Sequence, residues 1–432
     1  MDGKYRAYPE YKDSGVEWVG YIPKDWSVEP LFSVAFTEVI KNNNGQETNV
    51  LSLSYGNIIQ RDVEKNYGLL PESFNTYQLV NIGELILRLT DLQNDKRSLR
   101  VGHAKQAGII TSAYLKLIAK KNKLHDRYLY LLLHSYDTTK VFYGMGGGLR
   151  QSMNFEDMRR LSILIPSLDE QQQIANFLDH ETAKIDTLIE KQQQLITLLK
   201  EKRQALISHA VTKGLNPDAP MRDSGVEWLG QVPAHWDVMN YRYATRIYRG
   251  KFGHRPRNDP SFYGGDYPFI QTGDIAQADK KITKYKQTLN DRGISVSQKF
   301  PSGTLVMAIA ANIGQTAILD FEAYAPDSVV GFKPRAKLDL EFLRYSLMAA
   351  LPALEQTSTQ SAQANLNIDR IGTVKASFPP INEQHFIVEK LDNLLTQYAE
   401  IEKKTLSAIE LMQERRTALI STAVTGKIDV RN

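Results

Sequence analysis

The chain of 432 residues contains no cysteine. This absence excludes a disulfide framework and any metal site built from thiolates. The polar start Met1-Asp-Gly-Lys-Tyr-Arg6 is unlike a secretory signal peptide, and no apolar run is long enough to cross a membrane. We therefore expect a soluble, cytoplasmic protein with no membrane partner.

Motifs for catalysis are also scarce. The segment Phe378-Pro-Pro-Ile381 lacks the polar first residue of an amino-methyltransferase tetrad, and Gly426-Lys427 lacks the other residues of a phosphate-binding loop. The eight histidines show no spacing of paired metal ligands. Asp279 and Lys281 resemble part of a nuclease site, but a solvated turn is the simpler interpretation, since no upstream carboxylate is well placed. We expect no catalytic residue, metal or cofactor in this chain.

The sequence does contain an internal repeat. The matching segments are Asp13–Trp26 with Asp223–Trp236, Pro166–Gln171 with Pro379–Gln384, and Leu206–Thr212 with Leu419–Thr425. The offset varies in the earlier part of each copy and settles at 213 positions from Asp126 and Asp339 onward. The same parts in the same order indicate a tandem duplication, in which each half is large enough to form its own core.

Two heptad patterns lie in the regular part of the repeat. Residues separated alternately by four and three positions form an apolar stripe over about forty residues in each copy. The predicted interface comprises Ile174, Leu178, Ile185, Leu188, Leu195, Leu199, Leu206, Ile387, Leu391, Leu394, Tyr398, Ile401, Met412 and Leu419. A helix with one apolar stripe is unstable alone. We therefore predict that two helices, each roughly 60 Å long, pack as an antiparallel coiled coil.

The remaining sequence predicts domains of the α+β, or mixed α/β, class. Short β-rich runs such as Leu85–Leu89 and Thr304–Ile309 alternate with helical runs such as Asp126–Ser135. We expect two globular domains separated by the two long helices, with a pseudo-twofold relation from the duplication. The predicted boundaries are 1–165 and 215–378 for the globular domains, and 166–214 and 379–432 for the helices.

Candidate nucleic-acid contacts lie in two basic runs. The second copy contains Arg246, Arg249, Lys251, His254, Arg255, Arg257 and Asn258, interleaved with Tyr248 and Phe252. The first copy contains Lys96, Arg97, Arg100, His103 and Lys105. Such residues suit a loop that grips phosphates while Arg and Asn side chains reach base edges. A solvated charged face explains either run equally well.

A glycine-rich segment provides a further candidate contact. Gly144–Gln151 would let the backbone approach a ligand beside Arg150 and Gln151, and the second copy has Gln363 in the matching region. A flexible connector is the alternative interpretation of this segment.

Several motifs recur in a fixed order over nearly the whole chain. They are Trp18–Trp26 with its copy Trp228–Trp236, Tyr55-Gly-Asn-Ile58, Thr272-Gly-Asp-Ile275, the Pro-x-x-x-Glu-Gln segment before each long helix, and Lys202–Ser208. As an ordered set, twice repeated, they resemble the specificity (S) subunits of type I restriction–modification systems.

The resemblance implies that each globular domain is a target recognition domain reading one half of an interrupted double-stranded DNA sequence. The helices would set the spacing and dock two methyltransferase (modification) subunits. Those partners would methylate adenine N6 with S-adenosylmethionine, and restriction/translocase subunits would use ATP and Mg²⁺. This chain would be the non-catalytic subunit that directs methylation or restriction in phage defence.

By position, the resemblance also adds contact residues on the Gly-Asp-Ile-like turn and on the strand and loop that follow it. The complete predicted DNA-binding set is Tyr55, Asn57, Arg88, Thr90, Arg97, Arg150, Gln151, Lys251, His254, Arg255, Arg257, Asn258, Thr272, Asp274, Asn312 and Gln363. The alternative is a non-catalytic scaffold that binds proteins through its globular domains and DNA only incidentally.

Overall fold

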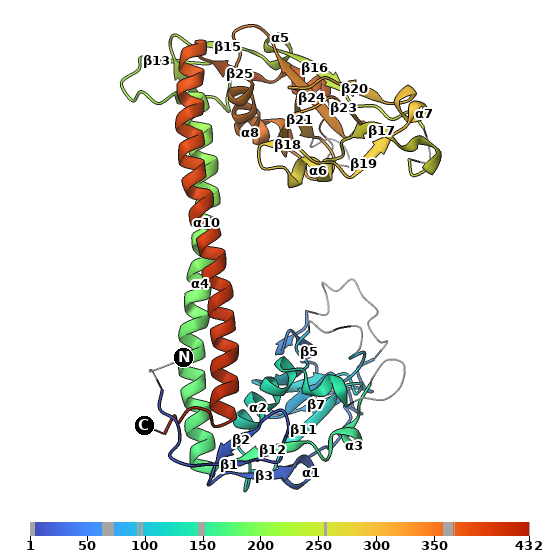
Figure 1. Ribbon diagram of the computed structural model, residues 1–432, viewed down its shortest axis with the longest axis vertical. Helices are drawn as coiled ribbons and strands as arrows, with labels where there is room; N and C mark the ends of the chain where they lie inside the picture. Colours follow the sequence, from blue (N-terminus) through green and yellow to red (C-terminus); the bar gives the residue numbers. More distant parts are fainter. Residues whose placement is uncertain are drawn as a thin grey trace. The chain divides into compact units, whose positions relative to one another are not determined.

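The chain divides into two compact units, each of which combines distant segments of the sequence. The computed structural model describes residues 5–62, 73–92, 95, 98–145, 152–254, 257–356, 366 and 368–431. One unit is formed by residues 1–192 and 406–432, and the other by residues 193–405. Each unit contains one globular domain and parts of both long helices, α4 (Leu168–Lys213) and α10 (Ile381–Val424) (Figure 1).

The globular domain of the first unit is built mainly of short strands. Its elements are β1 (Tyr11–Asp13), β2 (Tyr21–Pro23), β3 (Ser27–Pro30), α1 (Leu31–Val34), β4 (Ala35–Phe36), β5 (Leu51–Ser54), β6 (Asn57–Gln60), β7 (Gln78–Val80), β8 (Leu85–Leu87), β9 (Val101–His103), β10 (Gly108–Ile110), β11 (Leu115–Ala119), α2 (Asp126–Thr138), η1 (Val141–Gly144), α3 (Phe155–Met158) and β12 (Ser162–Ile165). An antiparallel sheet in the order β4–β11–β8–β9 lies at its centre, and α2 packs on this sheet. Two-stranded pairs β1–β2, β3–β12, β5–β6 and β7–β10 complete it.

The globular domain of the second unit has larger sheets. Its elements are β13 (Met221–Asp223), β14 (Gln231–Pro233), β15 (Asp237–Asn240), α5 (Tyr241–Ala244), β16 (Thr245–Arg249), η2 (Pro260–Phe262), β17 (Tyr263–Phe269), α6 (Thr272–Gln277), β18 (Lys281–Ile282), β19 (Gln287–Leu289), α7 (Asp291–Ser295), β20 (Gln298–Phe300), β21 (Leu305–Ala308), β22 (Thr316–Leu319), β23 (Ala323–Ala325), β24 (Val329–Pro334), α8 (Leu340–Gln356), α9 (Ile368–Thr373) and β25 (Lys375–Phe378). The sheets have the orders β16–β24–β21–β22–β18 and β19–β17–β23–β20. Helix α8 packs on β22 and β24.

Each globular domain has an inner strand, β8 or β21, that is buried on both faces. In β8, Leu85 and Leu87 face one hydrophobic cluster, while Ile86 faces another. In β21, Leu305 and Met307 likewise face one cluster, and Val306 and Ala308 face a second. Burial on both faces explains why these runs are continuously apolar instead of alternating. The structure therefore confirms the strands predicted in these two runs and their equivalence in the repeat.

The repeated tryptophan segments form hairpins at the ends of the long helices. Trp26 and Trp236 are each only 1% exposed. The Nζ of Lys213, the last residue of α4, donates to the carbonyl oxygens of Leu229 and Gln231 in the β13–β14 hairpin. Lys427, just beyond α10, donates in the same way to two carbonyls of the β1–β2 hairpin, at 3.1 and 2.7 Å. Each hairpin is therefore fixed to the end of a helix by a lysine.

A buried glutamine joins the start of each long helix to its globular domain. The Oε1 of Gln171 accepts from the backbone N–H of His125 at 2.8 Å, and its Nε2 donates to the carbonyls of Lys123 and Pro166 at 3.1 and 3.0 Å. Gln384 makes the same three contacts in the second unit, with Asp339, Lys337 and Pro379. Both side chains are buried. The repeated Glu-Gln motif therefore has a structural role.

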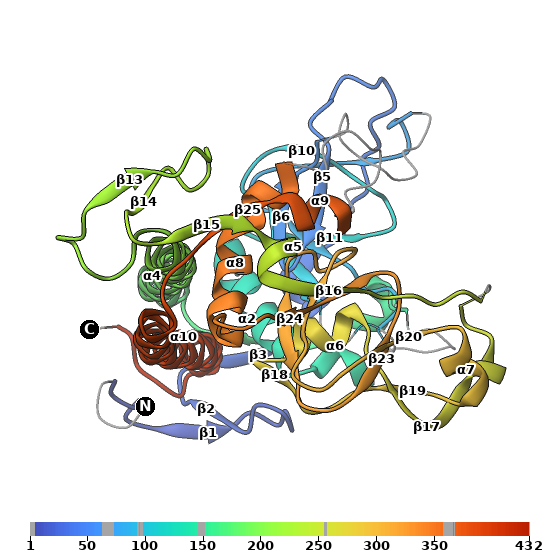
Figure 2. The same cartoon turned by 90° about the horizontal axis from the view of Figure 1, so that it is seen from above.

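Segments of α4 and α10 pack side by side in both units, and the views along and across the helices agree (Figures 1 and 2). In the first unit, Leu178 and Ile185 of α4 share a hydrophobic cluster with Leu419 of α10. In the second unit, Ile207 of α4 shares a cluster with Leu391 of α10. The early part of each helix thus meets the late part of the other, which is an antiparallel pairing.

Four of the fourteen predicted helix-interface residues are displaced by one position from the residues that are buried. Ten of the fourteen predicted residues are buried or partly buried, and eight of these ten are spaced by seven or fourteen positions, as in Leu178, Ile185 and Leu199. The predicted residues Leu188, Leu195, Leu394 and Ile401 are instead 49, 37, 37 and 41% exposed. Their places are taken by the next residue along the chain, Ile189, Ile196, Leu395 and Glu402. The prediction was wrong at these four positions because the helices carry two adjacent apolar stripes, and only one faces the partner helix.

Ion pairs also link the two helices within each unit. Asp186 of α4 binds Arg416 of α10 at 2.8 Å in the first unit, and Lys200 lies 3.7 Å from Glu402 in the second. These pairs are substantially exposed, so each adds little stability by itself.

Among the described residues, no helix has the combination of length and apolar character needed to span a bilayer.

We predict that Gln171→Leu destabilises the first unit by about 2–4 kcal/mol, because three backbone groups lose a buried hydrogen-bond partner. Hydrogen exchange at the backbone amide of His125, followed in the full chain, measures the effect directly. The matched control is Gln173→Leu, at an exposed position two residues further along the same helix. Equal exchange rates in the two variants would contradict a structural role for Gln171.

Candidate nucleic-acid interface

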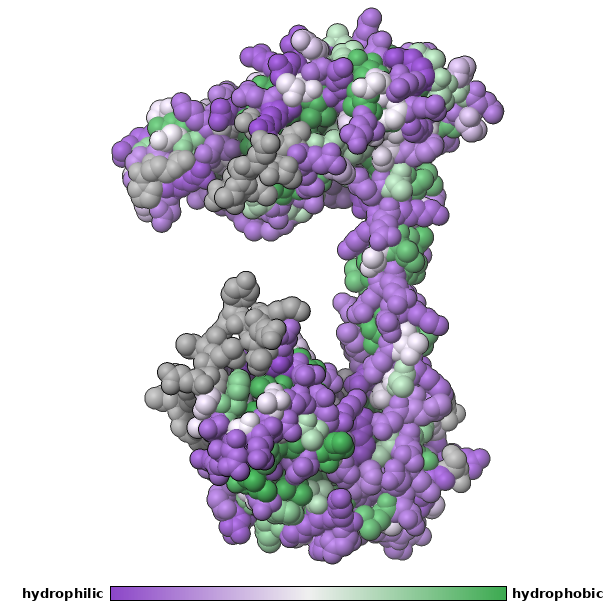
Figure 3. All heavy atoms as spheres, turned by 180° about the vertical axis from the view of Figure 1, so that it is seen from behind, coloured by the Kyte–Doolittle hydropathy of each residue, from purple (hydrophilic) through white to green (hydrophobic). Residues whose placement is uncertain are grey.

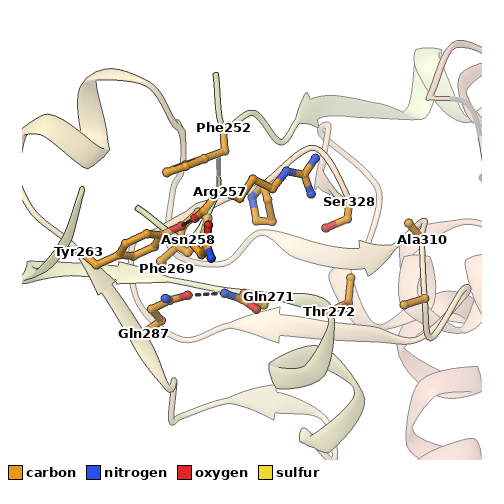
Figure 4. A pocket seen from close by; sticks show the side chains of 12 residues that line it. Phe252, Arg257, Asn258, Tyr263, Phe269, Gln271, Thr272, Gln287, Ala310 and Ser328 are labelled. Atoms are coloured by element: carbon orange, nitrogen blue, oxygen red, sulfur yellow. Dashed lines mark hydrogen bonds between the residues drawn. The ribbon is translucent and has the colours of Figure 1, made fainter. Parts of the chain in front are cut away.

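A hollow of about 480 Å³ opens in the globular domain of the second unit (Figure 4). Its aromatic wall is formed by Phe252, Tyr263 and Phe269. The ring of Phe252 stacks on Tyr263 at 5.8 Å between centroids and lies 5.4 Å from Phe269. Phe252 and Phe269 are each 3% exposed, so this wall belongs to a packed cluster. The hollow therefore has a rigid apolar side on which polar residues are arranged.

Three separate predicted segments converge on this hollow. Arg257 and Asn258 line it from the basic run, and Thr272 lines it from the start of α6. Ala311 lines it from the loop after β21, and the predicted residue Asn312 is its neighbour. These positions lie far apart in the sequence, and the fold brings them together. Arg257, Asn258 and Asn312 are all exposed.

The loop after β21 has an unusual backbone conformation. Ala311 and Asn312 have φ angles of 45° and 34°, in the left-handed region that non-glycine residues rarely adopt. Gly314 follows with φ 82°, and a Cβ there would lie 2.4 Å from a methyl group of Leu351. The glycine is thus required for packing, whereas the strained residues before it are exposed. Strained, exposed residues are typical of functional loops.

The basic run is held in place by neighbouring acids. Nη2 of Arg257 binds both carboxylate oxygens of Asp327, at 2.6 and 2.7 Å. Nε2 of His254 lies 3.2 Å from Asp259, and its ring stacks on Phe262. Hydrogen bonds from Ser261 and from His254 lower the pKa of Asp259. Lys251 is exposed. The run therefore contains two side chains fixed by acidic partners, Arg257 and His254, and an exposed lysine, Lys251.

Asp274 has a local structural role. It is 8% exposed, and its carboxylate accepts from the backbone N–H of Gln271 at 2.9 Å, which stabilises the start of α6. The segment Thr272–Ile275 lies in a helix, whereas Tyr55–Ile58 in the first copy forms a hairpin turn and strand. The two motifs that match in sequence therefore differ in conformation, and this region of the repeat is not structurally equivalent.

Two glutamines that sequence reasoning missed lie next to each other in the lining of the hollow (Figure 4). The Nε2 of Gln271 donates to the Oε1 of Gln287. They meet because Phe269 of β17 pairs with Gln287 of β19. A pair of amides presents both donors and acceptors, which is the pattern that complements the major-groove edge of adenine. No motif in the sequence could indicate the pair, since only strand pairing makes these residues neighbours.

In the first unit, a buried arginine organises the loop that carries Arg88 and Thr90. Arg100 is 0% exposed, and its guanidinium donates to the carbonyls of Thr90 at 2.9 Å, Asp91 at 3.3 Å, and Asp95. Arg88 lies 3.6 Å from Asp95. The interpretation of the first basic run as a phosphate-gripping loop is therefore wrong at Arg100, which shapes the loop from within.

A second hollow, of about 460 Å³, lies in the first unit between the β5–β6 hairpin and the long helices. Asn57, His103 and Lys105 line it from the globular domain, and Asp186 and Arg416 line it from the helices. His103 is bound to Asp126 at 2.6 Å. This hollow is polar, in contrast to the aromatic one of the second unit.

A buried histidine lies close to the cations of this second hollow. Burial, together with Arg416 and Arg127, lowers the pKa of His134 to about 4. His134 is consequently neutral at pH 7. The guanidinium of Arg127 is bound to Asp179 of α4, so α2 is joined to the helix by an ion pair.

Five predicted contacts lie outside the described residues: Arg97, Arg150, Gln151, Arg255 and Gln363.

Within the part of the chain that the structure describes, no cluster of histidine and acidic residues could hold a metal ion. Lys281 binds Asp320 at 3.0 Å, and the neighbouring Lys280 binds Glu341 and Asp392. Both lysines of the Asp279–Lys281 segment are thus held in ion pairs.

A family model for the type I restriction modification DNA specificity domain matches residues 100–198 and 253–411, more than half of the chain. A protein assigned as the type I restriction enzyme MjaX specificity subunit of Methanocaldococcus jannaschii is 24% identical over 437 residues, covering 96% of both chains.

Two solved structures share the fold. A chain from a type I R-M system, solved to explain complex assembly and conformational transition, superposes with a TM-score of 0.70 at 16% identity, over 93% of this chain and 98% of that one. The HsdS subunit from Thermoanaerobacter tengcongensis superposes with a TM-score of 0.52, also at 16% identity, over 94% and 98% of the two chains. The chain therefore belongs to the family of type I restriction–modification specificity subunits.

Proposed function

We propose that this chain reads an interrupted double-stranded DNA target, with one half-site bound by each globular domain. The observation that carries the proposal is a duplicated core with two different surfaces. Strands β8 and β21 are equivalent in the two units. The buried glutamines Gln171 and Gln384, here called the glutamine locks, are equivalent as well. The surfaces beside them differ, one presenting an aromatic hollow with amides and the other a polar hollow beside a hairpin. Two different surfaces on one framework suit two different half-sites.

The recognition domains correspond to residues 1–165 and 215–378, and the helices to 166–214 and 379–432. In the second domain, the exposed cations Lys251 and Arg257 would bind phosphates or guanine edges, since arginine offers a two-pronged donor. Asn258, Gln271 and Gln287 would contact base edges through their amides. The predicted contact His254 would support the loop through its pairing with Asp259.

The paired helices would set the distance between the half-sites and dock two methyltransferase subunits. Support comes from the second apolar stripe, which remains uncovered. Exposed apolar residues lie along both helices within the units, and Figure 3 shows hydrophobic residues at the helix surface. They are Leu188, Leu195 and Leu198 on α4 and Leu394, Ile401 and Leu411 on α10, while Leu406 is exposed on the other flank of the buried face of α10. Rows of exposed leucines on a helix are typical of surfaces that bind partner helices.

Catalysis would reside in the partners of this chain. The methyltransferase subunits would transfer a methyl group from S-adenosylmethionine to adenine N6, and restriction subunits would use ATP and Mg²⁺ for translocation and cleavage. This chain would supply sequence choice and scaffolding in the cytoplasm, as a non-catalytic component of phage defence.

Mapping methylated adenines in host DNA, with and without this gene, tests the proposal. We expect one motif that depends on the gene and that has two specified parts separated by unspecified base pairs. The two parts should differ in sequence, because the two recognition surfaces differ. A single uninterrupted motif, or a methylation pattern that does not depend on the gene, would count against the proposal.

We predict that Arg257→Ala weakens binding to DNA that carries the second half-site. If Arg257 reads a guanine, the loss is about 1–3 kcal/mol and one base position relaxes. If it binds a phosphate, binding to all sequences weakens alike. The slope of log K against log salt concentration then falls by about one. Titration of duplex DNA at several salt concentrations distinguishes these cases.

Two variants control this experiment. Asp327→Asn removes the acid that holds Arg257 and should retain or strengthen binding, because it removes a negative charge near the phosphates. Lys299→Ala, on β20 at the edge of the sheet opposite β19, removes an exposed ion-paired cation and should have little effect. Unchanged binding by Arg257→Ala would favour the alternative interpretation, in which the basic run around Arg257 is a solvated charged face.

We predict that Leu198→Glu or Leu411→Glu leaves the fold of the chain intact but weakens assembly with methyltransferase subunits. The two leucines are 60 and 65% exposed, so the free chain accepts a charge there, whereas a buried interface would lose about 2–4 kcal/mol. Sedimentation of the chain with its partner subunits measures assembly. Gln193→Glu, at an exposed polar position of α4, is the matched control. Normal assembly by both leucine variants would refute the docking surface.

A further inference from the structure

Tyr55 lies at the tip of the β5–β6 hairpin, where the chain reverses in two residues. Ser54 pairs with Asn57 across the hairpin, so Tyr55 and Gly56 alone form the turn. Their φ angles are 45° and 79°, the left-handed values that such two-residue turns require. Asparagine and glycine adopt these values readily, but an aromatic residue does not. The sequence Asn-Gly would therefore suit this turn better than the Tyr-Gly that occupies it.

The tyrosine side chain contributes little to the packing of the fold. It is 76% exposed, the largest exposed fraction among the large hydrophobic side chains described. Within the described residues, its hydroxyl makes no hydrogen bond and its ring contacts no other ring. Exposed side chains on strained backbone are found mainly where function requires them.

The base of the hairpin is rigid. A Cβ on Gly56 would lie 3.1 Å from the Cβ of Leu99, so the backbone of the turn packs closely on this residue. On strand β9, Gly102 leaves room for Leu53 and Ile58, whose methyl groups lie 2.6 and 2.7 Å from the position of its absent Cβ. The hairpin is thus fastened to the sheet by close packing, and the exposed aromatic ring projects from a fixed platform.

Polar groups that suit nucleic acid surround this platform. Asn57 is exposed directly after the turn and lines the polar hollow together with His103 and Lys105. A cation suits phosphate, an amide suits base edges, and an exposed aromatic ring suits stacking. All three kinds of group therefore lie on or beside one hairpin.

We propose that the ring of Tyr55, one of the predicted DNA contacts of the first recognition domain, enters a groove and stacks against one base step of the first half-site. This inference rests on the proposed function. Side chains that wedge between bases partly unstack a step, which costs least at flexible pyrimidine–purine steps. Tyr55 is thus expected to select such a step, TA or CA, at one position of the first half-site.

The variant Tyr55→Asn separates folding from binding in the full chain. Because Asn-Gly is the preferred sequence for this turn, the melting temperature should stay equal or rise. Binding to a duplex carrying the motif recovered from host DNA should weaken about tenfold, as expected for a lost ring–base contact. Tyr55→Trp retains a ring and should keep most of the binding.

Methylation in the host provides a second readout. With Tyr55→Asn, the preference at one step of the first half-site should relax, while the second half-site stays unchanged. Tyr21→Asn is the matched control, since Tyr21 is 62% exposed in the same unit but lies on β2, away from the hairpin. This control should bind and methylate like the unmodified chain.

Two results would overturn the inference. Tyr55→Asn could bind the duplex as tightly as the unmodified chain, or it could bind DNA normally but fail to assemble with methyltransferase subunits, which would make the hairpin tip a protein contact. Failure of the proposed function itself is seen separately, in the unmodified chain, as the absence of any gene-dependent interrupted motif.

Discussion

Each long helix carries apolar residues that it cannot bury alone. In each unit, a segment of α4 and a segment of α10 therefore complete one hydrophobic core together with the globular domain. The glutamine locks and the helix-end lysines fix the globular domain to the same helices. The first unit consequently depends on both ends of the chain, because its amino-terminal hairpin is held by Lys427. This shared burial is the constraint from which the two-unit architecture follows.

The duplication divides the molecule into a common framework and two individual surfaces. Residues of the framework, such as Trp26, Trp236, Gln171 and Gln384, are buried in both copies, and the two glutamines repeat their contacts. The surfaces differ because exposed loops are free of the packing constraints that fix a core. Backbone strain occurs in these loops, at Tyr55 in the first unit and at Ala311 and Asn312 in the second. A common framework with two different, locally strained loop regions is consistent with the proposal that each domain binds a different half-site.

Periodicity predicted both helices, but it could not choose between their two apolar stripes. Apolar residues occupy adjacent positions at 188 and 189, at 195 and 196, and at 394 and 395. Either member of each pair fits a heptad, since steps of three and four residues can alternate in either order. In the folded chain Ile189, Ile196 and Leu395 are more buried than the residues that precede them. The stripe left outside is the surface that we propose for the partner subunits.

The order of residues along the chain was enough to establish the duplication, the continuously apolar strands and the basic run around Arg257, because these are local or repeated patterns. Strand pairing decided that Gln271 meets Gln287, and burial decided that Arg100 supports a loop from within and that Asp274 stabilises the start of α6. Turn geometry gave Tyr55 its exposed, strained position. These features rest on contacts between distant residues, so no local pattern encodes them and only the tertiary structure decides them.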